Sequence, residues 1–176
     1  CALLMAVRQW RAAAFAILTL LGTAVANGAL KAAFARLRPD ILAQPLETFS
    51  FPSGHSSAAV ALFLTLGVLA GREQPPRLRL TWVLLATLPA TAIALSRVYL
   101  GVHWPTDVIA GALLAATICA ASLSIAQWRT PLYALSPRIW WLILPATLGL
   151  IGLLTLWGVP AGLQLYRAGR KGQLQR

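Results

Sequence analysis

The sequence predicts an all-α protein, a polytopic bundle of about five membrane-spanning helices. Of its 176 residues, 59% are hydrophobic and only 11% are charged, less than half the ~25% charge of ordinary soluble domains. The apolar residues also come in long blocks separated by short polar stretches, whereas the surface helices of a soluble domain carry a polar face. Both observations indicate a protein embedded in a bilayer. In a bilayer, only helices and closed barrels satisfy the hydrogen-bonding groups of the backbone.

Each apolar block is close to the ~20 residues that a helix needs to cross a bilayer. The first runs from Ala12 to Leu30, and we expect it to continue as a more polar helical end to Arg38, where Pro39 stops it. The other four blocks are 55–70, 80–95, 105–126 and 139–157. A polar turn containing Gly and Pro separates the second block from the third.

Three parts are expected along the chain. Residues 1–127 form a helical core, 128–160 hold an extra C-terminal transmembrane helix, and 161–176 form a basic tail. The apolar stretch 1–7 stops at Arg8 and is typical of the last turns of a truncated membrane helix.

The net charge of +11 raises the question of a nucleic-acid partner. The arginines flank apolar blocks instead of forming one stripe with aromatic residues, so we expect lipid headgroups and the bilayer as partners, and no nucleic acid. If alternate connections share one membrane face, segments 31–53 and 96–107 lie together. If the tail is set aside, the other membrane face carries seven basic residues and this face carries four. The positive-inside rule puts this face outside the cytoplasm, and we expect it to be the periplasmic face of a bacterial inner membrane.

Three polar clusters interrupt the apolar chain on this face. In the first, Lys31 and Arg38 are seven residues apart, close to two helical turns, so we expect them to share a helix face. Two cations snorkelling to headgroups are the alternative. In the second, Ser53 can cap a helix, Gly54 lets a ligand approach the backbone, and the free N–H groups favour an anion. An ordinary helix cap is the alternative there, although His55 adds a possible proton donor.

The third cluster contains Arg97, His103 and Asp107. His103 precedes a helix start and Asp107 lies in its first turn, so the carboxylate can accept from one imidazole nitrogen and leave the other free to attack. A capping Asp beside an interfacial His is the alternative. Together, three cations and a helix N-terminus suit a phosphoryl group. No set of His, Cys, Asp and Glu has metal-ligand spacing, so we expect catalysis without a metal or other cofactor.

Eleven positions of these clusters, in order and spacing, resemble the three signature motifs of the type-2 phosphatidic acid phosphatase superfamily. They are Lys31-x(6)-Arg38-Pro39, Pro52-Ser53-Gly54-His55 and Ser96-Arg97-x(5)-His103-x(3)-Asp107. The resemblance covers about 12–126. It implies that His103 attacks phosphorus to form a phosphohistidine, Asp107 orients it, and His55 protonates the leaving oxygen. It also implies that the phosphate oxygens are held by Lys31, Arg38, Ser53, the Gly54 backbone and Arg97.

The resemblance further implies a hydrolase acting on a lipid phosphate, such as undecaprenyl pyrophosphate, phosphatidic acid or phosphatidylglycerol phosphate. Membrane members resemble six-helix bundles with two helices before the one that carries Lys31, so we expect either a piece of a longer protein or an incomplete bundle. Two alternatives stay open: phosphotransfer to a lipid acceptor, and a non-enzymatic binder or transporter of anionic lipids. The superfamily also includes soluble vanadate-dependent haloperoxidases, against which the apolar blocks argue.

Overall fold

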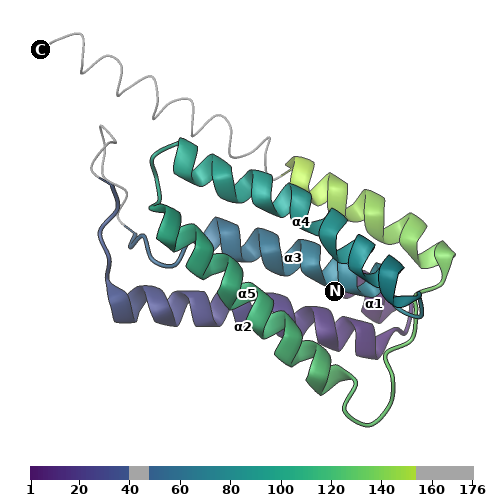
Figure 1. Cartoon of the computed structure of the whole chain (residues 1–176). Helices are drawn as coiled ribbons and strands as arrows, with labels where there is room; N and C mark the ends of the chain where they lie inside the picture. Colours follow the sequence, from purple (N-terminus) through teal and green to yellow (C-terminus); the bar gives the residue numbers. More distant parts are fainter. Residues whose placement is uncertain (40–47, 154–176) are drawn as a thin grey trace, which may run out of the picture.

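The computed structural model describes residues 1–39 and 48–153. Its elements, in chain order, are α1 (Ala2–Ala6), α2 (Trp10–Phe34), α3 (Gly54–Ala70), α4 (Pro76–Tyr99), α5 (Pro105–Ala126) and a further helix over Pro137–Leu153 (Figure 1). The described ranges contain no strand, so the all-α prediction is confirmed.

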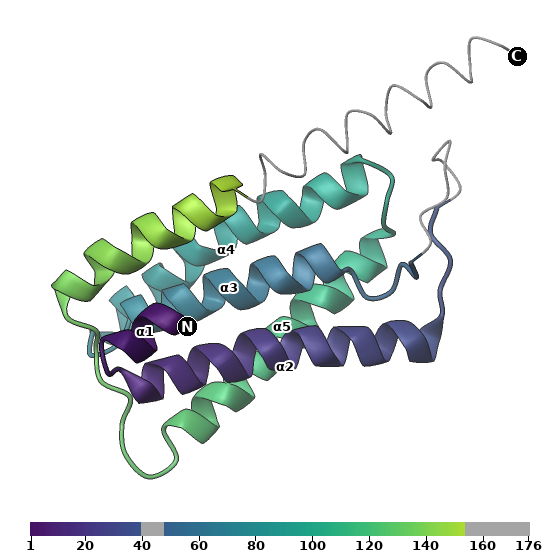
Figure 2. The same ribbon diagram turned by 180° about the vertical axis from the view of Figure 1, so that it is seen from behind.

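Within 1–39 and 48–153, three helices, α2, α4 and α5, are long and apolar enough to cross a membrane, and α3 and Pro137–Leu153 are shorter apolar helices. The central helix is α3, which packs against α2, α4 and α5 (Figures 1 and 2). Many large apolar side chains point outward from the bundle, for example Leu84 and Leu88 of α4. Lipid tails solvate such a surface, whereas water would not.

One end of the bundle, called the core end below, holds the largest group of buried apolar side chains. There α1, the start of α2 and the end of α3 meet residues 132–143 (Figure 2). The group consists of Leu4, Ala12, Ala13, Phe15, Ala16, Leu69, Cys119, Leu132, Leu135, Ile139 and Ile143. Arg72 and Arg11 reach across this end, because they donate to the carbonyl of Leu132 and to the carbonyls of Ala126 and Thr130, respectively.

The opposite end, called the site end, gathers the connections before α3 and before α5 (Figure 1). The ring of Phe34, the last residue of α2, lies 4.9 Å from that of Phe51. The N–H of Ser50 donates to the carbonyl of Arg36 at 2.7 Å. The segment that leads into α3 is therefore fastened to the segment that leaves α2.

The helix boundaries correct two predictions. The first helix does not continue to Arg38, because Ala35 adopts a left-handed conformation (φ 42°, ψ 34°) and ends α2 at Phe34. The helix predicted over 80–95 is longer, Pro76–Tyr99, since its ends carry arginines that an apolar window leaves out. The predicted 139–157 helix begins at Pro137 and is described to Leu153; the rest of it and the tail lie outside the described residues.

Candidate active site

The carboxylate of Asp107 is fully enclosed at the site end, with none of its surface exposed. Asp107 lies in the first turn of α5, where its Oδ2 accepts from the backbone N–H of Trp104 at 3.0 Å. The same Oδ2 lies 3.5 Å from Nδ1 of His103. That separation is long for a hydrogen bond, and Nδ1 has no other partner among the described residues. The carboxylate is thus held by the helix start and faces the imidazole.

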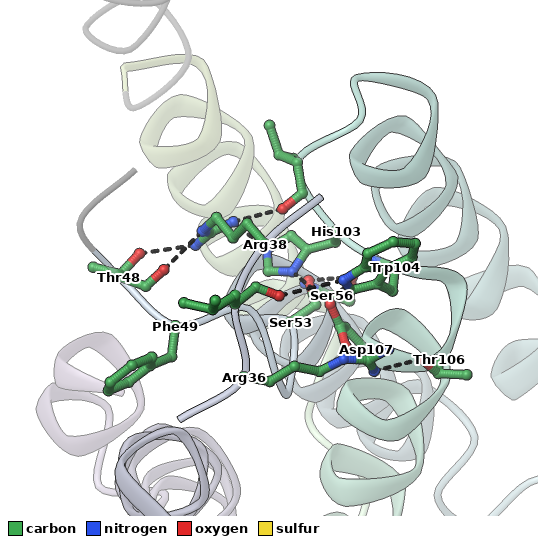
Figure 3. A network of polar contacts seen from close by, with 12 residues as sticks. Arg36, Arg38, Thr48, Phe49, Ser53, Ser56, His103, Trp104, Thr106 and Asp107 are labelled. Atoms are coloured by element: carbon green, nitrogen blue, oxygen red, sulfur yellow. Dashed lines mark hydrogen bonds and ion pairs between the residues drawn. The ribbon is translucent and has the colours of Figure 1, made fainter. Parts of the chain in front are cut away.

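The other imidazole nitrogen of His103 meets Arg38. One guanidinium nitrogen of Arg38 lies 3.1 Å from Nε2 and donates to the carbonyl of Val102 at 2.7 Å. The remaining two nitrogens donate to the carbonyl and hydroxyl of Thr48, at 2.9 and 2.8 Å (Figure 3). Because a guanidinium only donates, Nε2 must be the accepting nitrogen. The ring proton therefore sits on Nδ1, on the side of Asp107.

The environment of His103 favours the neutral imidazole. Burial, and after it the positive charge of Arg38, lowers the pKa of His103 to about 4, against the opposing influence of Asp107. Desolvation disfavours the charged form, and a nearby cation does the same. At neutral pH the ring is uncharged, which is the form that can act as a nucleophile.

The start of α3 is bonded directly to the start of α5. Ser53 caps α3 as predicted, because its Oγ accepts from the N–H of Ser56 at 3.4 Å. Its own N–H donates to the carbonyl of Asp107 at 2.9 Å. A Cβ on Gly111 would lie 2.7 Å from the carbonyl oxygen of Ser53, so only glycine permits this approach of the two helices. The contact sets the distance between the α3 N-terminus and the imidazole.

Three other predicted site residues also lie at the site end. The ammonium of Lys31, in the last turn of α2, donates to the carbonyl of Phe49. His55, in the first turn of α3, is exposed and within electrostatic range of Arg97, Arg38 and Lys31. Arg97, in the last turn of α4, has a buried Nε without a partner among the described residues.

The remaining predicted residue, Gly54, is the first residue of α3. A Cβ there would lie 3.5 Å from the side-chain oxygen of Asn27 and 3.9 Å from Cε of Lys31. The α3 N-terminus therefore opens beside the lysine side chain, where the prediction placed an anion.

The predicted shared helix face of Lys31 and Arg38 is wrong. Arg38 lies four residues beyond the end of α2, in the non-helical segment that follows Ala35. The two cations still lie within electrostatic range of each other. The fold, instead of helix periodicity, brings them together.

Arg36 also belongs to the site, and sequence reasoning assigned it no role. Its NH1 donates to Oδ1 of Asp107 at 2.9 Å and to the hydroxyl of Thr106 at 2.8 Å (Figure 3). Its position two residues before Arg38 was the only available signal. No local pattern indicates a partner that lies 71 residues further along the chain.

The charges of the site end suit an anion. Asp107 is the only carboxylate that the described residues contribute at this end, and it interacts with Lys31, Arg36 and Arg38. A fourth cation, Arg97, lies within electrostatic range of His55. Basic side chains and a helix N-terminus bind phosphate oxygens in proteins. No group of three or more His, Cys, Asp or Glu side chains that could hold a metal lies within 1–39 and 48–153.

Comparisons with known proteins agree with this reading. The sequence profile of the PAP2 superfamily matches residues 12–131. The chain is 40% identical over 97 residues to an undecaprenyl-diphosphatase of Sulfolobus acidocaldarius, which covers 52% of this chain and 41% of that protein. It is 36% identical over 88 residues to phosphatidylglycerophosphatase B of Bacillus subtilis, covering 48% of this chain and 43% of that protein. The chain spans less than half the length of these two curated relatives.

Solved structures extend the likeness to the fold. A transmembrane PAP2-type phosphatidylglycerolphosphate phosphatase of Bacillus subtilis aligns with a TM-score of 0.57 and 28% identity, covering 65% of this chain and 59% of that one. LpxE of Aquifex aeolicus aligns with a TM-score of 0.54 and 29% identity, covering 69% and 72%. Together with the long apolar helices, they confirm the predicted membrane helical bundle and an integral membrane protein.

Proposed function

This chain belongs to the PAP2 superfamily, and on that premise we propose that it is a membrane phosphatase that hydrolyses a phosphomonoester or diphosphate of a lipid. The observation that carries the proposal is the placement of His103. One nitrogen of its ring faces the buried Asp107, and the other meets a guanidinium at 3.1 Å. A neutral imidazole between a carboxylate and a cation is the arrangement that nucleophilic attack on an anionic phosphoryl group needs.

In the proposed ground state, the phosphate oxygens replace backbone carbonyls as partners of the cations. Lys31 and Arg38 donate to carbonyls of the 48–49 segment, and the Nε of Arg97 has no partner among the described residues. Each can turn a donor to a phosphate oxygen, together with the Ser53 hydroxyl and the Gly54 N–H. Charge-assisted hydrogen bonds of this kind are about twice as strong as those to neutral carbonyls, which favours the exchange.

In the proposed chemical step, Nε2 of His103 forms a bond to phosphorus while the bond from phosphorus to the lipid oxygen breaks. Nδ1–H turns toward Asp107, and the long 3.5 Å contact shortens, as catalytic hydrogen bonds often do when substrate binds. His55 gives its proton to the leaving oxygen. Water then attacks phosphorus and gives a proton back to His55, while the bond from phosphorus to Nε2 breaks. Orthophosphate leaves, and the His103 imidazole is regenerated.

The substrate class follows from the location of the site. It lies at the end of apolar helices, where a headgroup in water can reach it while its tail stays in the bilayer. The names of the relatives include undecaprenyl-diphosphatase and phosphatidylglycerophosphatase, so undecaprenyl pyrophosphate, phosphatidylglycerol phosphate and phosphatidic acid are the first candidates. We further propose that 1–127 is the catalytic core and that the site faces the periplasm of a bacterial inner membrane.

The test is phosphate release from a panel of lipid mono- and diphosphates by the detergent-purified chain, with and without a chelator. We expect release from at least one lipid, no loss with the chelator, and no release by His103→Ala whose helix content and elution volume match the parent. Release by His103→Ala would contradict the proposal. Headgroup binding without release by folded protein would favour the lipid binder, and release that depends on an added alcohol would favour phosphotransfer.

A further inference from the structure

We propose that Arg36 is a positioning residue that fixes the Asp107 carboxylate and, through it, the tautomer of His103. The kinetic part of this inference rests on the proposed function; the tautomer part does not. Arg36 lies outside the group of residues predicted to hold phosphate, so its role must be argued from its contacts.

The two carboxylate oxygens of Asp107 have different partners. Oδ1 accepts from Arg36 at 2.9 Å, whereas Oδ2 accepts from the Trp104 N–H at 3.0 Å and faces Nδ1 of His103. A carboxylate held at both oxygens cannot rotate about its Cβ–Cγ bond. Arg36 therefore keeps Oδ2 directed at the imidazole.

Arg36 is itself held from several directions. Its carbonyl accepts from Ser50 and its guanidinium nitrogen also donates to Thr106. The guanidinium carbon lies 5.5 Å from the centroid of the Trp104 ring, within the range of a cation–π contact. The Trp104 indole N–H donates to the carbonyl of Leu37 at 3.3 Å, so the ring is tied to the same segment. The side chain is clamped between two segments that both border the site.

The contacts of Arg36 differ in kind from those of the other cations. Lys31 and Arg38 donate to neutral backbone carbonyls, and Arg97 has an unpartnered nitrogen among the described residues. Those donors are available to an anion. The NH1 of Arg36, whose side chain is 40% exposed, is committed to a carboxylate with no exposed surface. Drawing it away to bind substrate would leave that carboxylate buried without its guanidinium partner, which is costly.

Removal of Arg36 leaves a buried carboxylate without its guanidinium partner. Such a group either takes up a proton or rotates toward water. In both cases Nδ1–H of His103 loses its acceptor, while the Arg38 guanidinium still donates toward Nε2. The Nδ1–H form then keeps only one of its two determinants, and we expect a second population with the proton on Nε2, the nitrogen that must attack. The remaining charges that face the imidazole, Arg38 and Lys31, do not restore an acceptor.

The direct test is the tautomer of His103 by ¹⁵N NMR of the full chain in detergent micelles. Only two histidines are present, so a His55→Gln variant assigns both signals. We expect the Nδ1–H form in the parent, loss of that single form in Arg36→Ala, and its return in Arg36→Lys. Arg77→Ala, which removes an exposed cation at the core end, should change nothing. An unchanged His103 signal in Arg36→Ala would overturn the inference.

A double-mutant cycle gives the kinetic test. We expect Arg36→Ala to lower kcat about 10- to 100-fold, as the loss of an orienting partner does, with KM unchanged. In the Asp107→Asn background, the same change should have no further effect on kcat. A raised KM, or an equal loss in both backgrounds, would mean that Arg36 binds phosphate and would refute the positioning role. If the parent releases no phosphate, the proposed function fails, and the tautomer measurement alone decides the role of Arg36.

Discussion

The two ends of the bundle are stabilised by different forces. At the core end, side chains such as Phe15 and Leu69 are buried against one another, and their burial contributes free energy without a required direction. At the site end, the buried groups are polar: Ser50, Ser53 and Asp107 have no exposed surface. Hydrogen bonds and an ion pair hold them, and those contacts do require direction and distance. Stability and chemical geometry are therefore separated along the helix axes.

The largest expected effect is on activity and concerns the site end, where the contacts require direction and distance. Asp107→Asn keeps the size of the side chain but removes the charge that faces Nδ1 of His103 and the partner of Arg36. We expect kcat to fall roughly 10³- to 10⁴-fold, as occurs when an orienting carboxylate is replaced in a nucleophile–His–Asp system. Steady-state phosphate release measures it, and thermal unfolding should shift far less than activity. A loss below tenfold would show that the carboxylate does not orient the imidazole.

The next prediction compares two glycines with the same steric constraint at different places. A Cβ on Gly111 would lie 2.7 Å from Ser53 O, and one on Gly67 would lie 2.8 Å from Ala86 Cβ and 2.9 Å from Trp82 O. Overpacking of this kind costs about 1–3 kcal/mol of unfolding free energy, so both alanine variants should unfold more easily.

The two variants should differ in activity. Gly111→Ala separates the α3 N-terminus from the start of α5, and a small misplacement at a site can cost ~10²-fold in rate. Gly67→Ala, between α3 and α4, should keep kcat. Gly28→Ala, where a Cβ meets nothing within 4 Å, is the control for the substitution itself. Equal losses of kcat in the Gly67 and Gly111 variants would contradict the claim that kcat depends on the geometry of the site end in particular.

The smallest effect concerns the pKa of His103, which burial and Arg38 lower to about 4 and which Asp107 opposes. Removing the cation in Arg38→Gln should raise this pKa toward its usual 6.5, and Asp107→Asn should lower it further. Since only the neutral ring attacks, the acid limb of kcat/KM in Arg38→Gln moves to higher pH. NMR titration of His103 measures both shifts, with Arg72→Gln at the core end as the control. Shifts of the opposite sign would contradict the electrostatic account.

Much of this arrangement could be predicted from the sequence, because apolar block length and motif spacing are local properties. The starts of α3 at Gly54 and of α5 at Pro105 agree with the predictions. The end of α2 could not be predicted, since Ala35 is not a residue that favours a left-handed conformation. Contacts between distant segments, from Ser50 to Arg36 and from Trp104 to Leu37, accompany the non-helical segment after it.

The same limit applies to the site. Ser53, His103 and Asp107 could be predicted because a helix start places capping and reactive groups at fixed offsets. The partnership of Arg36 with Asp107 depends on the fold of two segments that are 71 residues apart. No local pattern in a single sequence indicates such a pair.

The central claim is that His103 becomes covalently phosphorylated, and the most direct measurement is the phosphoenzyme itself. A lipid carrying ³²P in its phosphate is mixed with the detergent-purified chain and quenched in alkali within one turnover, because a phosphohistidine survives alkali and is lost in acid. We predict alkali-stable, acid-labile label on the parent and none on His103→Ala. Phosphate release without label on the parent, or label that persists in His103→Ala, would contradict the account.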